Sequence, residues 1–323
     1  MEIFKKPNID FIGLRWLPIG LSILVMILSV GSITFKGFNY SIEFTGGTLL
    51  QIGFPVGAKI TVEEVRDAMK SHDLHAEIQS VEAERPIFLL REQATDTAAA
   101  TLFADNTIAT LKKMFPSFTP SLDRKDVIGP VVGKDLRRRT VWAIVLSLLG
   151  IVVYVAYRFE NPIWAVVGVV ALFHDVIGVA GLFSAMALPM DLLIVTALLT
   201  IAGYSISDTI VIFDRMREKL RYERDMPLID LINSSINETL SRTIITVLTV
   251  QIVSLVLLFF GGPVLHNFAL AMVVGNLLGT YSTIGVAVPL VYEYQIRFGS
   301  KRHSALPVAE PAIKVKEGGR RRK

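Results

Sequence analysis

Long apolar runs are the strongest pattern in this sequence. Six of them approach the ~20 residues that an α-helix needs to cross the ~30 Å hydrocarbon layer of a membrane, and few charged residues interrupt them. The pattern therefore predicts an integral membrane protein with six transmembrane helices. We expect these helices within residues 16–35, 141–157, 163–188, 192–213, 243–260 and 268–292.

The first apolar run has a signal peptide as its alternative interpretation, with a cleavage site near Val30-Gly31-Ser32. The apolar region of a signal peptide is usually only ~7–15 residues long, and this run is longer. We therefore expect an uncleaved transmembrane helix.

One long segment, residues 36–139, is less apolar and is long enough for a small domain. Its predicted order, βαββαβ, is that of a ferredoxin-like α+β sandwich. The first helix has a clear start, because Thr61 and Glu64 form a capping box. The second has an apolar stripe of Leu102, Phe103, Ile108 and Leu111. We expect one bent strand region at 40–44 and 48–54 around Gly46-Gly47, further strands at 76–81, 87–90 and 118–127, and helices at 61–71 and 96–114.

The distribution of lysine and arginine predicts the orientation of the chain in the membrane. If the N-terminus is cytoplasmic, the short cytoplasmic segments are rich in these residues, whereas the short outer loops around 189–191 and 261–267 contain none. Both termini are then cytoplasmic, and 36–139 is a periplasmic domain. The expected organisation is an N-terminus at 1–15, a first helix at 16–35, the domain at 36–139, a five-helix bundle at 140–295 and a basic tail at 296–323.

The net charge of +4, in this arrangement, indicates contact with anionic lipid and not with nucleic acid. The tail residues 320–323 are the expected lipid contact.

An acidic residue, Asp208, lies within the fourth apolar run. It is about five residues, or ~8 Å, from the inner end of that run. Thr200, Tyr204, Ser207 and Asp208 fall on one helical face, so the carboxylate should face protein or water and not lipid. Ionisable residues inside membranes usually mark a transport or proton pathway. A buried structural aspartate is the alternative.

Arg242 is the predicted partner of Asp208. It stands at the inner edge of the next apolar run, at a similar depth. Between the two, at about 215–241, apolar residues at helical spacing predict an amphipathic helix on the inner membrane surface. Protonating Asp208 would release Arg242, and losing the proton would restore the ion pair. The two residues are therefore the candidate proton relay.

A second candidate relay lies deeper. His174 and Asp175 are near the middle of the third run, where they either relay protons or hydrogen-bond neighbouring helices. Gly275 and Gly279 are spaced as in a helix-packing motif, which more often seats another helix than a ligand.

Several kinds of active site have no sequence signal. The chain has no cysteine, no phosphate-binding GxxxxGK[ST] motif, no zinc-ligand spacing and no serine or cysteine triad. We therefore expect no cofactor, no metal and no enzymatic activity.

Together, several segments resemble the SecF family of bacterial protein-export subunits. They are IEFTGGTLLQI, VIGPVVGKDL, ALFHDVIG, GYSISDTIVIFDRMREK, ETLSRTIIT and FALAMVVGNLLGTYSTIGVAVPL, in the family's order from about residue 10 to 297. The chain departs from the usual family pattern at Glu43, where aspartate is usual, and at Asp135, where glutamate is usual.

The resemblance implies one half of a transporter of resistance-nodulation-division (RND) architecture, with SecD as the other half. It implies association with the SecYEG channel and use of the proton gradient to help translocate secreted preproteins. By motif, Asp208 and Arg242 match the family's transport-linked pair, and His174-Asp175 matches a recurring family motif. Two alternatives are an RND-type exporter of a small molecule or lipid, and a scaffold that moves no protons.

Overall fold

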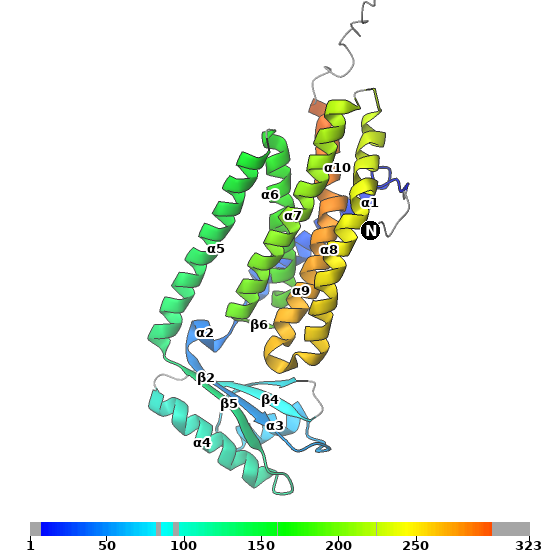
Figure 1. Ribbon diagram of the computed structural model, residues 1–323. Helices are drawn as coiled ribbons and strands as arrows, with labels where there is room; N and C mark the ends of the chain where they lie inside the picture. The colour runs from blue at the N-terminus through cyan, green and yellow to red at the C-terminus, as the bar shows by residue number, and fades with distance from the viewer. Residues whose placement is uncertain (1–7, 82–84, 93–96, 160, 224, 299–323) are drawn as a thin grey trace, which may run out of the picture.

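The computed structural model describes residues 8–81, 85–92, 97–159, 161–223 and 225–298, and shows a helical bundle above a small α+β domain (Figure 1). In this part of the chain, six helical segments are long and apolar enough to cross a membrane, as predicted. The predicted lipid contact at 320–323 lies outside the described residues. The six segments are α1 (Trp16–Lys36), α5 (Pro130–Arg158), α6 (Pro162–Ala185), α7 (Leu192–Tyr222), α8 (Leu228–Phe260) and the continuous Gly262–Phe298.

The last segment contains a change of helix type. It consists of α9 (Gly262–Ser282), a π-helical turn at Thr283–Ala287, and α10 (Val288–Phe298). The π-turn is packed inside the bundle, since Thr283, Gly285, Val286 and Ala287 are all buried. Single π-turns inside α-helices are often found at functional sites.

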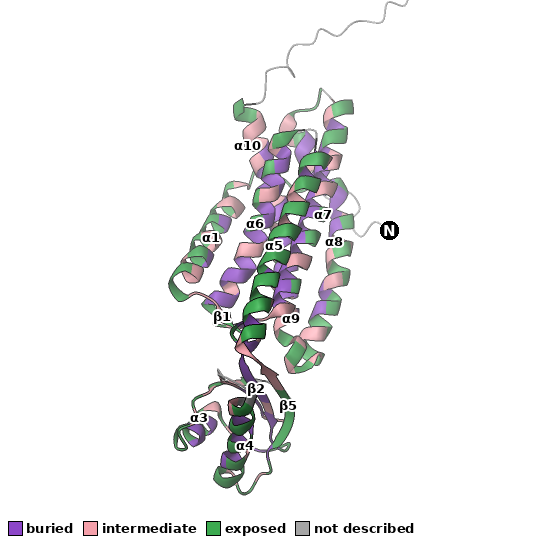
Figure 2. Cartoon of the chain, turned by 90° about the vertical axis from the view of Figure 1, so that its left-hand side faces the viewer, coloured by how far each residue is buried: buried purple, intermediate pink, exposed green. Residues whose placement is uncertain are grey.

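The helices differ in how much protein surrounds them. The apolar windows of α6 and of the last segment are 61% buried, whereas those of α1, α5 and α8 are 11% buried. Thus α6 and α9 form the centre of the bundle. Figure 2 shows α5 exposed along most of its length. Its apolar surface is therefore free to contact lipid or another chain.

Close packing of α1 against α6 depends on Gly181. A Cβ atom at this position would lie 2.2 Å from Ser29 Cβ and 2.5 Å from Ser29 Cα. We expect Gly181→Ala to push α1 outward and to cost about 1–3 kcal/mol, the usual penalty of overpacking. Thermal unfolding of the purified protein would measure the loss.

Gly150 provides the matched control, because a Cβ atom there would meet no atom within 4 Å. Gly150→Ala should be neutral or slightly stabilising, since glycine is a poor helix former. Equal behaviour of the two variants would contradict the packing argument.

The α+β domain has the predicted ferredoxin-like topology. Its four antiparallel strands are ordered β3-β4-β2-β5, and Leu50 and Phe88 are among the core residues between the sheet and its two helices. The predicted capping box of Thr61 and Glu64 is present. Leu102 was predicted for the core but is 62% exposed, and Ala104 and Thr107 are buried in its helix instead. The elements are β2 (Gly47–Gly53), α3 (Val62–Lys70), β3 (Glu77–Val81), β4 (Ile87–Glu92), α4 (Thr97–Met114) and β5 (Ser121–Ile128).

The prediction of a strand at 40–44 is wrong. Only β1 (Asn39–Tyr40) is extended, and it pairs in parallel with β6 (Pro189–Met190) in the α6–α7 connection. The next residues form the short helix α2 (Ile42–Thr45). The backbone explains the change, because the N–H groups of Thr45 and Gly46 donate to the carbonyls of Ser41 and Ile42 within one helical turn and not to a neighbouring strand. Ile42 and Phe44 are both buried in this turn.

The predicted surface helix is also absent as a separate element. Residues 214–222 continue α7 and residues 228–242 belong to α8, so the two helices form one long hairpin (Figure 1). The apolar residues Leu231, Ile232 and Ile236 pack in the bundle core with residues of α7 such as Met216. They are therefore covered by protein and not by lipid. We call this end of the bundle the hairpin end, and the opposite end the domain end.

Candidate functional site

Asp208 lies on the buried side of α7, and its side chain is 8% exposed. It lines a cavity of about 10 Å³ between α7, α8 and α9, at the lower limit of the space that one water molecule needs. The predicted stripe is divided: Tyr204 lines the same cavity as Asp208, whereas Ser207 lines a different one, and Thr200 hydrogen-bonds within its own helix. The carboxylate accepts no hydrogen bond from a described residue.

Arg242 does not contact Asp208 in this structure. In the described part of the chain its guanidinium has no acidic partner within 4.0 Å. It lines a larger cavity, about 340 Å³, with Ser207 and Asp214 of α7 and Tyr154 of α5. The ion pair predicted from the sequence is therefore not formed, although both residues belong to the α7–α8 hairpin.

Asp175 is the centre of a buried polar cluster that the sequence did not predict in full. Its side chain is fully buried on α6. One carboxylate oxygen contacts His174 Nδ1 at 2.9 Å, and the other accepts hydrogen bonds from the hydroxyls of Ser205 on α7, at 2.5 Å, and Ser282 on α9, at 2.8 Å. The cluster therefore joins the three most buried helices. The Nε2 atom of His174 is buried with no partner.

The polar contacts continue from this cluster to the π-turn. The Thr209 hydroxyl donates to the carbonyl of Ser205 and lies 3.0 Å from the Thr283 hydroxyl, in the first residue of the π-turn. Ser205 also lines the cavity of Asp208. Ser205 thus connects the cavity of Asp208 with Asp175 on one side and, through Thr209, with the π-turn on the other, and these groups form a polar line through the bundle.

Two predicted packing glycines lie beside this line. A Cβ atom at Gly275 would lie 2.2 Å from Ile201 Cδ1, and one at Gly279 would lie 3.3 Å from Ser205 Cβ. Both glycines therefore allow α9 to approach α7. The neighbouring side chain of Asn276 is buried, and its Nδ2 atom has no partner.

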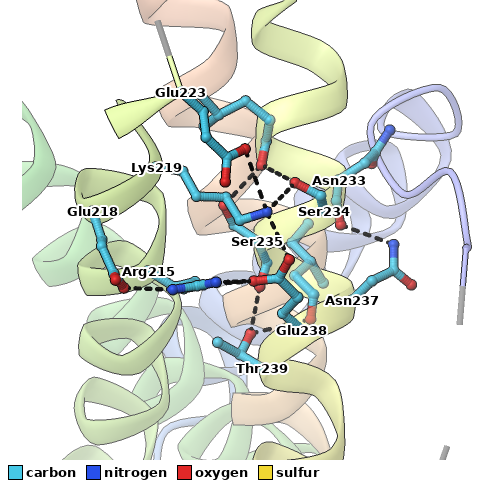
Figure 3. Close-up of polar contacts among 12 residues, drawn as sticks. Arg215, Glu218, Lys219, Glu223, Asn233, Ser234, Ser235, Asn237, Glu238 and Thr239 are labelled. Carbon is cyan, nitrogen blue, oxygen red and sulfur yellow. Dashed lines mark hydrogen bonds and ion pairs between the residues drawn. The ribbon is translucent and has the colours of Figure 1, made fainter. Parts of the chain in front are cut away.

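Charged residues join α7 and α8 at the hairpin end (Figure 3). Lys219, 5% exposed, donates to Glu238 at 2.7 Å and to Ser234 at 2.8 Å. Arg215 also pairs with Glu238, and donates to Glu218 at 2.6 Å. Glu238 lies one helical turn before Arg242. Ion pairs between side chains therefore join α7 to α8 directly beside the Asp208–Arg242 region.

The N-terminal segment docks on the same hairpin through two asparagines of α8. Asn233 Oδ1 accepts from the backbone N–H groups of Phe11 and Ile12, each at 3.1 Å. Asn237 Oδ1 accepts from the N–H of Ile9 at 3.1 Å, and its Nδ2 donates to the Ile9 carbonyl at 2.9 Å. These contacts bury Ile12 completely in the core. The sequence did not reveal them, because they join positions more than 200 residues apart.

A cavity of about 400 Å³ separates the domain from the bundle. It lies between the face of the sheet opposite its helices, with Leu49, Gln51 and Arg91, and the domain-end residues Asp191 and Val264. Burial raises the pKa of the Asp191 carboxyl and lowers the pKa of the Arg91 guanidinium. The sheet is thus not packed flat on the membrane helices.

No group of three or more potential metal-ligating side chains occurs among the described residues. The buried polar groups of the described membrane helices are carboxylates, hydroxyls, amides, the imidazole of His174, the indole of Trp164 and the ammonium group of Lys219. These groups suit proton or ion movement and helix contact.

Two family models match the chain. Residues 107–297 match "Protein export membrane protein SecD/SecF, C-terminal", and residues 31–54 match "SecD/SecF GG Motif". The first match covers more than half of the chain. The chain belongs to the SecF family.

Relatives and a solved structure agree with this assignment. The protein translocase subunit SecF of Endomicrobium trichonymphae is 37% identical over 95% of this chain and 97% of its own length. That of Thermodesulfovibrio yellowstonii is 39% identical over 90% and 96%. The crystal structure of Thermus thermophilus SecDF is similar with a TM-score of 0.77 and 37% identity, over 90% of this chain and 39% of that chain.

SecF-family membership makes this chain a multi-pass inner-membrane protein with an accessory role in protein export. The family model at 107–297 covers Asp175, Asp208 and Arg242, and the GG-motif model covers α2 and all of β2. The assignment thus includes both the polar line in the membrane and the joint between the domain and the bundle.

Proposed function

We propose that this chain acts with SecD to couple proton entry to the export of preproteins through SecYEG. The observation that carries the proposal is Asp208, a buried carboxylate inside a membrane helix that faces a protein cavity and contacts no basic side chain among the described residues. Because burial disfavours the charged form of a carboxylate, the free energy of this part of the protein changes strongly when the carboxylate gains or loses a proton. The transmembrane potential supplies ~2.3 kcal/mol per charge per 100 mV.

In the proposed orientation, both termini and the hairpin end are cytoplasmic and the α+β domain is periplasmic. This orientation follows the distribution of lysine and arginine. The ionic cross-links of Arg215 and Lys219 to Glu238 are then on the cytoplasmic side. The basic tail would contact anionic lipid there.

The proposed switch has two states. In one, Asp208 is ionised and paired with Arg242. In the other, Asp208 is protonated and Arg242 is released into the cavity beside Ser207 and Asp214. The proposal of a second state is supported by the separation of the two residues, which line different cavities in the structure. The helices that carry them would shift between states, because Arg242 exchanges one set of neighbours for another.

SecD is the proposed partner in the membrane, because the similar Thermus thermophilus chain is SecDF and is more than twice as long as this one. The exposed, apolar α5 offers a surface for it. An exporter of small apolar molecules is less well supported, since the cavity of about 400 Å³ beside the domain is lined by charged residues such as Arg91, Lys125 and Asp191.

Variants of Arg242 test the switch. Arg242→Lys should keep part of the export activity, because the cation remains, whereas Arg242→Leu should lose most of it. Pulse-chase labelling of a secreted reporter, in cells without the native copy, would measure both. Arg297→Leu is the control, since Arg297 pairs only on the surface of its own helix with Glu293, and it should be silent. Normal export by both Arg242 variants would remove Arg242 from the mechanism.

A further inference from the structure

A carboxylate of the α+β domain's connecting segment binds the first turn of α7. Glu43 of α2 accepts a hydrogen bond from the backbone N–H of Leu192 at 2.8 Å. Leu192 is the first residue of α7, the helix that carries Asp208. A carboxylate is favourable at this point, because the first N–H groups of a helix have no partner within the helix and its N-terminus is partially positive.

The segment around Glu43 is attached to the α6–α7 connection along its length. The Ser184 hydroxyl donates to the Gly37 carbonyl at 2.7 Å, and the backbone N–H of Ser41 donates to the Met190 carbonyl at 2.9 Å. Between these contacts β1 pairs with β6. Residues 37–43 therefore run along α6 and α7 at the domain end of the bundle.

The other end of α2 is fitted against α5. Gly46 follows α2 with a φ of +76°, and a Cβ atom there would lie 2.8 Å from Pro130 Cα. A Cβ atom at Gly133 would lie 2.7 Å from the backbone nitrogen of Gly46. Backbone meets backbone at this point, so α2 and the start of α5 form a close joint without side chains between them.

The sheet is attached to the helical bundle at this same joint. Gly47, the first residue of β2, pairs with Ile128, the last residue of β5. Both strands therefore leave the sheet side by side, one toward α2 and the other toward Pro130 of α5. The rest of the exposed sheet face lies across the cavity of about 400 Å³. A movement at the joint can thus tilt the sheet without breaking a packed interface. It would change the exposed hydrogen bond of 2.8 Å that Asn39 Nδ2 of β1 donates to Glu77 of β3.

We propose that Glu43 is a positioning residue that transmits displacement of α7 to the α+β domain. When α7 shifts on protonation of Asp208, the Leu192–Glu43 bond moves α2, and α2 turns β2 and the sheet about the α2–α5 joint. The inference rests on the proposed function for the source of the α7 movement. The contact joins the N-terminus of α7 to α2, and so links the two parts whose movements the proposal couples.

Three variants of the full chain, each purified with SecD, test this role. Glu43→Ala removes the acceptor, Glu43→Gln keeps an amide oxygen that can accept from Leu192, and Asp208→Asn removes the proton site. Export is followed by pulse-chase, and proton flux is followed in vesicles that contain the complex. Because the chain has no cysteine, Asp105→Cys and Val264→Cys can carry paired spin labels that report the distance from the domain to the bundle.

Glu43→Ala should lower export several-fold and widen the label-distance distribution, while proton flux and co-purification with SecD stay as in the parent protein. Glu43→Gln should resemble the parent. Normal export with an unchanged distance distribution in Glu43→Ala would overturn the proposal. Loss of proton flux or of SecD binding in Glu43→Ala would also overturn it, because Glu43 would then act in the proton path or in the fold.

The proposed function fails in a different way. If Asp208→Asn keeps both proton flux and export, the proton-coupled mechanism is wrong, whatever Glu43 does. The spin-label distances in Glu43→Ala depend only on the tie between α2 and α7. The two proposals are therefore separated by independent measurements.

Discussion

Asp208→Asn should reduce export to the level of cells that lack this protein, while the chain still folds and binds SecD. Asparagine has nearly the same shape as aspartate but cannot gain or lose a proton near neutral pH. Because Asp208 accepts no hydrogen bond from a described residue, the substitution removes no hydrogen bond among the described residues. Pulse-chase labelling of a secreted reporter, with SecD co-purification in parallel, would measure the effect.

Asp230→Asn is the control for this prediction. Asp230 is exposed in the first turn of α8. It lines neither the cavity of Asp208 nor that of Arg242, so its substitution should leave export intact. If Asp208→Asn exported normally, Asp208 would be a structural residue, and the scaffold alternative would gain support.

Asp175→Ala should give the largest loss of stability. The substitution leaves His174 Nδ1 and the Ser205 hydroxyl without their acceptor in the centre of the bundle, whereas the Ser282 hydroxyl keeps its hydrogen bond to the Gly279 carbonyl. Each buried donor left unsatisfied costs about 1–3 kcal/mol. We therefore expect little folded protein to accumulate, and a markedly lower unfolding temperature for what remains.

Asp175→Asn should be milder, because its amide oxygen still accepts hydrogen bonds. Thr196→Ala is a control at an exposed hydroxyl that bonds only to the Leu192 carbonyl of its own helix, and it should unfold like the parent protein. Thermal unfolding in detergent would rank the three variants. A stable, active Asp175→Ala protein would show that the cluster does not hold α6, α7 and α9 together.

The sequence predicted those features that depend on local pattern. The six apolar runs predicted the membrane helices because hydrocarbon demands long apolar segments. The capping box of Thr61 and Glu64 predicted the start of α3, because both partners lie within one helical turn. The βαββαβ order was sufficient for the domain fold, although not for α2, whose four residues are too few for a periodic signal.

Features that depend on contacts between distant segments were not predictable. The apolar stripe of Leu231, Ile232 and Ile236 showed that one face of a helix is covered, but not whether lipid or protein covers it. Ser205 and Ser282 had no local signal, because an isolated serine in a membrane helix is common. Depth along the helices placed Asp208 and Arg242 at one level, but rotation about the helix axes determines whether their side chains meet.

Proton movement through the reconstituted complex tests the central claim most directly. The chain and SecD would be placed in vesicles with a pH-sensitive dye inside, and a proton gradient would be imposed across the membrane. The account predicts a proton flux in the parent complex that is lost in the Asp208→Asn complex. An equal flux in the two complexes would contradict it.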